Sequence, residues 1–492
     1  MGITSRDKTP RARVVVAFSA LLAVMTVVLA AIGCATNPVT GRHELSLVSS
    51  DEEARIGREG MGAVVAEYGV YDDTRLKAYV DSVGHRLAAV SHLPQLEWHF
   101  TLLDDPTVNA FAMPGGYIYI TRGILAHLNS EAQLAGVMGH EIGHVTARHA
   151  ARQMTQQQLA GLGLGLAQAF STTFRQYSPA AQQALGLLML KYSRDDETQA
   201  DELGVEYATK AGWDPRVIPS TYEMLGRISD KSGQRLPGYL STHPDPGDRQ
   251  TRTTQLSAAA AAGKTGLIVN GRSYLERLDG LVFGNDPRNG YIDGDVLVEP
   301  RNGFELRLPP GWKRQSTQQS LMSANPAQTA GFEASLGVGD NRSPGERIAA
   351  LQQAGRISAA SGRDETLGGY AAWVGAVIVP GDAGPERMLV TLARLSDTSM
   401  LQITGRSAAA DDDDERAILT CMRSVRPIES AHAHPEVMRV AVPKVTSAGS
   451  FQSVVGGLGT QAIDLDDTAI LNDRYPDQPV LAGELIKVVR KH

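Results

Sequence analysis

Two histidines and a glutamate in the first third of the chain have the residue types and the spacing of a metal-dependent hydrolase. His140 and His144 lie four residues apart, and Glu141 follows the first histidine. Residues four apart on a helix share one face, so both imidazoles can bind one ion while the adjacent carboxylate acts as a general base toward water. These residues predict one Zn²⁺ per chain, since neutral imidazoles bind zinc at about 2.0–2.1 Å. Surface histidines without a metal are the alternative for the motif alone.

An acidic segment further along the chain supplies a candidate third ligand. Glu197 and Asp201 lie four residues apart after Ser193, so both project from the same side of a predicted helix. Glu197 can complete a set of two histidines and one glutamate that leaves the fourth position to water. Asp201 can accept a hydrogen bond from a ligand imidazole and fix its tautomer. Exposed helix carboxylates are the alternative interpretation.

Two more polar residues could act at the same site. His243 precedes Pro244 on a predicted loop, where a histidine is as often simply exposed. Arg249 could pair with a carboxylate near the metal, donate to an oxyanion, or lie in solvent.

The elements expected to position these residues are helices beside a short antiparallel sheet. Apolar residues recur at helical spacing over 51–93 and again over 130–155. Alternating residues predict strands at 97–103 and 117–121. The Ala-, Gly-, Leu- and Gln-rich stretch 158–192 is interpreted as an amphipathic helical pair, with a membrane hairpin as the alternative.

Several short motifs in a fixed order resemble the gluzincin metallopeptidases of family forty-eight, which include the CAAX prenyl proteases and the HtpX, BepA and Oma-type proteases. They span about residues 37–280 and comprise Asn37-Pro38-Val39-Thr40-Gly41, Asn109-Ala110-Phe111-Ala112 with Pro114-Gly115-Gly116, His140 to His144, Tyr192-Ser193-Arg194 with Glu197 and Asp201, and Thr242-His243-Pro244 with Arg249. The resemblance implies zinc bound by His140, His144 and Glu197. It also implies that Glu141 is the general base.

The resemblance gives His243 two alternative roles. In related proteases the matching histidine lies over the zinc, where it stabilises the oxyanion or, in BepA-like members, takes the fourth coordination position and keeps the enzyme latent. We expect His243 to gate activity. We also expect a substrate backbone to extend along an edge strand at Asn109 to Ala112.

The first 33 residues are expected to be a lipoprotein signal peptide. Basic residues precede Val14–Ile32, a run of 19 residues without a charge. Ala31-Ile32-Gly33-Cys34 resembles a bacterial lipobox, whose cysteine becomes the acylated N-terminus, and Ala35 is not the Asp that signals inner-membrane retention. These features predict an outer-membrane lipoprotein that faces the periplasm of a Gram-negative bacterium. An uncleaved membrane anchor is the alternative.

The remaining chain is expected to form two accessory modules after a peptidase domain at 34–285. Residues 290–430 are predicted to form a small sheet closed by a helix over 412–424, in which Cys421 is buried. Gly303-Phe304 and Pro310-Gly311-Trp312 are similar to PsbP and Mog modules. Residues 436–492 resemble a degenerate LysM module that binds either peptidoglycan or a protein.

The predicted fold is therefore α+β, with a mainly helical zincin-type domain, a small α+β domain and a βααβ module. The net charge of −7 leaves no global basic field, so nucleic acid is not an expected partner. The predicted function is a zinc metalloendopeptidase for misfolded or stalled envelope proteins. A chaperone or cell-wall-binding adaptor that retains the peptidase fold is the alternative, although an adaptor needs no intact metal set.

Overall fold

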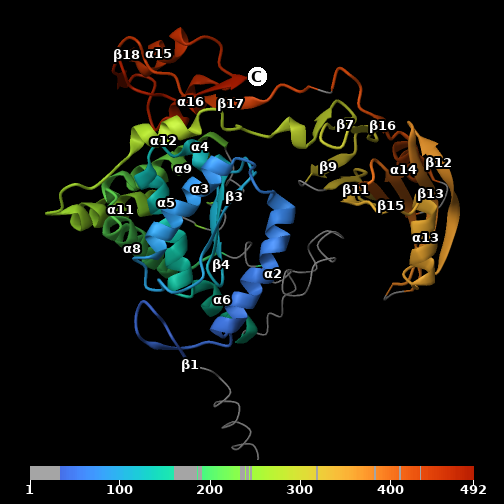
Figure 1. Cartoon of the computed structure of the whole chain (residues 1–492), viewed down its shortest axis with the longest axis horizontal. Helices are drawn as coiled ribbons and strands as arrows, with labels where there is room; N and C mark the ends of the chain where they lie inside the picture. Colours follow the sequence, from blue (N-terminus) through green and yellow to red (C-terminus); the bar gives the residue numbers. More distant parts are fainter. Residues whose placement is uncertain are drawn as a thin grey trace, which may run out of the picture. The chain divides into compact units, whose positions relative to one another are not determined.

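The computed structural model describes residues 34–159, 186, 191–232, 239, 243, 246–316, 320–381, 384–408, 412–432 and 434–492 (Figure 1). Helices and sheets are mixed along these residues, which confirms the α+β class. The predicted signal peptide (1–33) and most of the predicted helical pair (158–192) lie outside the described residues. Among the helices that the structure describes, none has the length and apolar content needed to cross a membrane.

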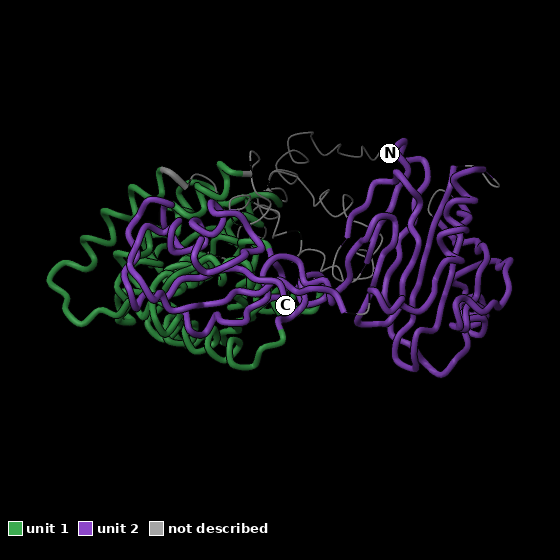
Figure 2. Tube along the Cα trace, turned by 90° about the horizontal axis from the view of Figure 1, so that it is seen from above, with its two compact units in different colours: residues 1–63, 72–102, 107–274 green, residues 64–71, 103–106, 275–492 purple. Residues whose placement is uncertain are grey.

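The chain divides into two compact units (Figure 2). The first contains residues 72–102 and 107–274 together with the chain up to residue 63, and it holds all the residues predicted to bind metal or substrate. The second contains residues 275–492 and two short segments, 64–71 and 103–106. The predicted domain limits at residues 285, 290, 430 and 436 remain predictions.

The single helix predicted over 51–93 is wrong, because the chain forms two helices here, α2 (Ser50–Tyr68) and α3 (Thr74–Ala88). Gly69 follows α2 with a φ of 68°, a left-handed conformation that ends helices and suits glycine. Asp73 then caps α3 by accepting hydrogen bonds from backbone N–H groups of its first turn. The helical spacing of apolar residues therefore continues through a short segment that is not helical.

Two small sheets belong to the peptidase-like region. In the first, β1 (Cys34–Thr36) pairs antiparallel with β2 (His43–Leu45). The second has the order β3-β5-β4. Its strands β3 (His99–Leu103) and β5 (Tyr117–Thr121) confirm the two predicted strands. The third strand, β4 (Ala110–Met113), pairs antiparallel with β5 and lies at the edge of the sheet.

The residues described between 122 and 278 are mainly helical and form α4 (Arg122–His127), α5 (Glu131–Thr146), α6 (His149–Leu159), α8 (Arg194–Lys210), α9 (Pro219–Ser232), α11 (Pro246–Ala261) and α12 (Gly271–Leu278). The helix predicted over 130–155 is interrupted, because α5 ends at Thr146 and α6 begins at His149. Arg148 lies in the turn between them with a φ of 56°.

The described residues from 291 to 427, in the second unit, form two antiparallel sheets. The larger has the order β12-β13-β14-β15-β11-β10-β9 and the smaller the order β16-β8-β7-β6. Their strands are β6 (Tyr291–Asp293), β7 (Val296–Glu299), β8 (Phe304–Arg307), β9 (Lys313–Ser316), β10 (Ser320–Ala324), β11 (Gly331–Val338), β12 (Ala359–Leu367), β13 (Tyr370–Val379), β14 (Glu386–Arg394), β15 (Ser399–Arg406) and β16 (Arg426–Pro427).

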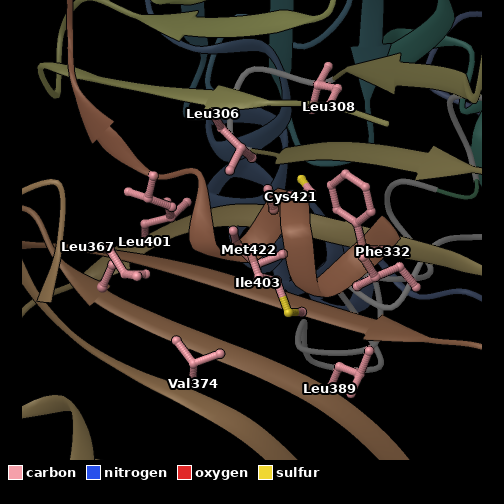
Figure 3. Close-up of a cluster of buried hydrophobic side chains, with 14 of the residues drawn as sticks. Leu306, Leu308, Phe332, Leu367, Val374, Leu389, Leu401, Ile403, Cys421 and Met422 are labelled. Carbon is pink, nitrogen blue, oxygen red and sulfur yellow. The ribbon is translucent and has the colours of Figure 1, made fainter. Parts of the chain in front are cut away.

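Helix α14 (Asp413–Arg423) confirms the predicted helix after the larger sheet, whereas α13 (Pro344–Gln353) was not predicted. Figure 3 shows apolar side chains of α14, including Met422, packed against Phe332 and Ile403 from the sheet. Cys421 belongs to this core and is 2% exposed, so its predicted burial is confirmed. Burial raises the pKa of its thiol to about 12, which makes it an inert core residue at neutral pH.

The C-terminal segment forms β17 (Met438–Ala441), β18 (Gly449–Ser450), α15 (Phe451–Gly457), α16 (Leu465–Leu471), β19 (Pro479–Val480) and β20 (Val488–Lys491). β17 pairs antiparallel with β20. The backbone N–H groups of Gly280 and Phe283 donate to the carbonyls of Val440 and Met438 at 2.8 and 2.9 Å. The likeness of this segment to LysM modules remains a prediction.

Candidate metal centre

The two motif histidines lie on one face of α5, as their spacing predicts. Ser130 caps this helix by accepting a hydrogen bond from the backbone N–H of Gln133 at 3.1 Å. The Nε2 atoms of His140 and His144 lie 3.0 Å apart, and each residue is 1% exposed. Both rings therefore direct one nitrogen to the same point inside the protein.

Helix α8 carries the acidic residues to that point. Ser193 and Asp196 form a capping box that starts the helix. Glu197 then lies with Oε2 at 3.5 Å from His140 Nε2 and Oε1 at 3.6 Å from His144 Nε2. Its carboxylate completes the predicted set of two histidines and one glutamate.

Glycines allow α5 and α8 to approach closely enough for this geometry. A Cβ added at Gly204 of α8 would lie 2.9 Å from the backbone nitrogen of His140. A Cβ added at Gly139 of α5 would lie 3.0 Å from the carbonyl oxygen of Gly204. Larger residues would therefore force the two helices, and with them the metal ligands, apart.

His243 lies inside the same cluster. Its Nδ1 is 2.8 Å from Glu197 Oε1, and its Nε2 is 3.6 Å from Glu141 Oε1. Its ring stacks on Tyr239 with centroids 4.4 Å apart, and it is 1% exposed. The donor atoms of His140, His144, Glu197 and His243 all lie within 4.8 Å of one another, a set consistent with one zinc ion.

Asp201 and Arg249 lie behind the ligands. Asp201 Oδ1 is 3.0 Å from His140 Nδ1, the contact predicted for a group that fixes the tautomer of that imidazole. Arg249 is 2% exposed and contacts Asp201 Oδ1 at 2.6 Å and Glu197 Oε2 at 2.8 Å. Burial opposes the ionisation of Asp201, but Arg249 and His140 outweigh it, so the pKa of its carboxyl lies below the ordinary range.

The surroundings of Glu141 are the clearest indication that a metal ion and water bind at this site. It is fully buried, and neither carboxylate oxygen has a hydrogen-bond partner among the described residues. Burial raises the pKa of this carboxyl, and the nearby His243 partly opposes the rise. Burial also lowers the pKa of His144, which keeps that imidazole neutral and able to bind a metal. An orphaned carboxylate beside three or four metal donors fits a zinc site that also holds water.

The predicted substrate-binding residues lie at the edge of the small sheet. Asn109 precedes β4, and its Oδ1 is buried without a partner among the described residues. Ala110 and Phe111 are buried, whereas Ala112 is partly exposed. Helix α5, which carries the metal ligands, packs against β4.

Two contacts near the metal ligands were not predicted from the sequence. His149 Nδ1 lies 2.8 Å from His144 Nδ1, and its Nε2 lies 3.0 Å from Gln199 Oε1. The ring of Tyr192 stacks on His144 with centroids 4.0 Å apart. A histidine five residues after His144 was a visible signal, but its orientation depends on the turn at Arg148.

Comparisons with known proteins agree with this geometry. Residues 74–257 match the model of Peptidase family M48. The chain is 37% identical over 182 residues to mitochondrial metalloendopeptidase OMA1 of Arabidopsis thaliana, covering 37% of this chain and 36% of that protein. It is 34% identical to OMA1 of Schizosaccharomyces pombe, covering 42% and 61%. The beta-barrel assembly-enhancing protease of Escherichia coli is 29% identical, covering 54% and 56%.

The chain thus spans about one third to three fifths of the length of these curated relatives. Among solved structures, cyanobacterial PsbP from Synechocystis matches 28% of this chain and 95% of its own at a TM-score of 0.22 and 11% identity. A TM-score this low carries no argument, so the likeness of residues 290–430 to PsbP remains a prediction.

Proposed function

We propose, from the premise that residues 74–257 form a peptidase family M48 domain, that this protein is a zinc-dependent endopeptidase for misfolded or stalled envelope proteins. One observation carries the proposal: His140, His144 and Glu197 converge beside the carboxylate of Glu141, which accepts no hydrogen bond from the described residues. Burying a carboxylate without a partner is costly, and a binding protein gains nothing from it.

His140, His144 and Glu197 would hold the zinc ion. Zinc bound there would act as a Lewis acid that polarises a substrate carbonyl and makes water more acidic. Glu141 takes a proton from the attacking water at a carboxylate oxygen and delivers it to the leaving amine. Its raised pKa suits this exchange, because a weakly acidic carboxyl accepts and releases a proton more readily near neutral pH.

Asp201 and Arg249 act as positioning residues in this proposal. Asp201 holds the proton of His140 at Nδ1, which leaves Nε2 free for the metal. The positive charge of Arg249 contacts the carboxylates of both Asp201 and Glu197. This allows the two buried carboxylates to remain ionised together.

The substrate backbone would add to the outer edge of β4 (Ala110–Met113), where no further strand pairs among the described residues. An extended peptide there pairs with backbone groups of an edge strand, which binds many sequences with similar strength. This suits a protease that acts on unfolded polypeptides. The side-chain oxygen of Asn109, which has no hydrogen-bond partner in the part of the chain that the structure describes, would accept a hydrogen bond from the same peptide.

His243 would keep the enzyme latent. Its Nδ1 contacts Glu197 and its Nε2 approaches Glu141, so its ring takes the space that water and substrate need. Activation then requires His243 to move away from Glu197 and Glu141. The same histidine, acting instead as an oxyanion donor, would have to stay close to the metal.

The protein would be anchored in the outer membrane through acylated Cys34 and face the periplasm. The small residues before Cys34 and the uncharged run at 14–32 support this location. Mass spectrometry of the membrane-bound protein should find an acylated Cys34 as its N-terminal residue. Residues 1–33 still attached to the protein would instead indicate an uncleaved anchor. Residues 436–492 would bind peptidoglycan or a protein partner.

The decisive experiment compares the full chain with its Glu141→Gln variant. We expect each to contain one zinc per chain by metal analysis. We expect the variant to cleave casein or an unfolded outer-membrane protein at least about 100-fold more slowly, since it lacks the general base. Cleavage at the native rate by this variant would rule out the proposed mechanism.

A His243→Ala variant separates the two roles of this histidine. We expect faster cleavage than in the native chain, because the variant no longer fills the space in front of the metal ligands. Loss of cleavage with zinc still bound would assign His243 to oxyanion stabilisation instead. A His85→Ala variant is the control, since His85 is an exposed histidine on α3.

A further inference from the structure

A second polar site lies in the second unit, where the C-terminal end of α14 meets the smaller sheet. A cavity of about 280 Å³ opens there, between β7, β8, β16 and the turn that joins β12 to β13. Its walls carry three arginines, Arg307, Arg423 and Arg426, and one acid, Glu305. The negative end of the α14 dipole, about half a charge, is therefore outweighed by the guanidinium groups.

The acid in this wall is already neutralised. Glu305 is 1% exposed; its Oε1 accepts from Arg426 at 2.5 Å and its Oε2 lies 2.8 Å from His432 Nδ1. Arg426 also pairs with Glu429 at 2.7 Å. Glu305, Glu429 and His432 have a geometry that could hold a cation, but a guanidinium already occupies the space between the two carboxylates.

The other two arginines keep unused hydrogen-bonding capacity. The side chain of Arg307 is exposed and has no ion pair among the described residues. Arg423 reaches the carboxylate of Glu365 only at 3.5 Å, and that carboxylate accepts at 3.1 Å from Arg363. An anion in the cavity could therefore bind the guanidinium groups of Arg307 and Arg423 without displacing a close ion pair.

The backbone holds these arginines in place. Ser424 Oγ accepts a hydrogen bond from the backbone N–H of Arg307 at 2.8 Å, which ties β8 to the end of α14. Gly368 has a φ of 54°, and a Cβ there would lie 2.5 Å from the Cα of Arg426. Only glycine lets the β12–β13 turn close the cavity on this side.

We propose that this cavity binds a phosphate group between Arg307 and Arg423. A guanidinium donates paired hydrogen bonds to phosphate oxygens, and these charge-assisted bonds are about twice as strong as neutral ones. The cavity is slightly smaller than the roughly 300–1,000 Å³ typical of ligand pockets, which suits inorganic phosphate or a small phosphate ester. The phosphate comes either from a soluble ester or from a lipid headgroup. The proposal is independent of the peptidase chemistry.

The test titrates the full chain with inorganic phosphate, glycerol phosphate and succinate by calorimetry at low ionic strength. We expect one saturable phosphate site, with succinate bound more weakly. Arg307→Gln and Arg423→Gln should each weaken phosphate binding about ten-fold or more. Arg356→Gln, which removes an exposed arginine of the same unit outside the cavity, should bind as the native chain does.

A Val296→Phe variant checks the cavity without changing its charge, since this residue lines it. Filling the space should abolish phosphate binding, while an unchanged unfolding temperature shows that the variant is folded. Binding of vesicles that contain phosphatidic acid, lost in Arg307→Gln, would identify a lipid source. Binding of glycerol phosphate alone would identify a soluble one.

Three results would overturn the proposal: no saturable phosphate binding, equal affinity in the native chain and both arginine variants, or tighter binding of succinate than of phosphate. Zn²⁺ binding that is lost in His432→Ala would instead assign Glu305, Glu429 and His432 to a cation site.

Discussion

The ring of His144 is oriented by a hydrogen bond to the imidazole of His149 rather than to a carboxylate. To offer Nε2 to a metal, His144 must carry its proton on Nδ1 and donate it to His149 Nδ1, 2.8 Å away. His149 must then carry its own proton on Nε2, which faces Gln199 Oε1. Burial lowers the pKa of His149 to about 4, so the neutral form that this arrangement needs is present at pH 7.

Replacing His149 with Ala should lower the affinity for zinc without removing a metal ligand. We expect zinc affinity to fall about 10–100-fold, the usual effect of losing a group that orients a ligand. The absorption spectrum of the cobalt-substituted protein should also change, since the ring of His144 is no longer fixed. An unchanged affinity, measured against His85→Ala as control, would show that His149 only fills space.

The sequence predicts the relative positions of functional residues when they lie close together on one helix. His140, His144 and Glu141 share one helix, so their geometry follows from the helical repeat alone. The contacts of His149 and Tyr192 with His144 could not be predicted, because they depend on the turn at Arg148 and on where the residues before α8 lie in the fold. His243 was predicted on a loop, and no periodicity of the sequence indicates where such a residue lies relative to the metal ligands.

Helices α5 and α8 form the rigid frame of the metal centre. One supplies both histidines and the other the glutamate, and their separation is set by glycines at the contact. The distance between metal ligands therefore depends on residues that carry no functional group.

A Gly204→Ala substitution tests this frame. Its methyl group would meet the backbone of His140 at 2.9 Å, and the backbone cannot move without moving the ligands. We expect a loss of about 1–3 kcal/mol in the free energy of unfolding, as for other overpacked cores, together with weaker zinc binding. Denaturant unfolding and metal competition measure the two effects.

Gly226 of α9 provides the matched control, because a Cβ there meets nothing within 4 Å. Alanine at this helical position should be neutral or stabilise by up to about 1 kcal/mol. A loss of stability as large as that of Gly204→Ala would show that the close contact is not the cause.

Element prediction succeeded where the apolar pattern is long and failed at interruptions. The strands β3 and β5 and the helix α14 follow their patterns. The break after α2 and the turn after α5 preserve the helical spacing of apolar residues, so only the left-handed backbone at Gly69 and Arg148 reveals them. The capping box at Ser343 was a local signal for α13.

For the molecule as a whole, zinc should stabilise one unit and leave the other unchanged. All four candidate donors lie in the first unit, so bound metal adds its binding free energy to the folding of that unit. On treatment with a chelator, we expect amide hydrogen exchange to accelerate in α5, α8 and α11. Exchange in the seven-stranded sheet should stay the same. Acceleration there as well would mean that the metal stabilises both units.

The backbone pairing between residues 280–283 and β17 limits where this chain can be shortened. The N–H groups of Gly280 and Phe283 donate to carbonyls of residues in the C-terminal segment, and Val282 forms a bridge with Arg439. A recombinant fragment that stops before residue 436 would leave this stretch as a bare strand edge, open to pairing with another copy. Fragments intended for crystallisation or antibody production should therefore keep the last 57 residues or replace their strand with a cap.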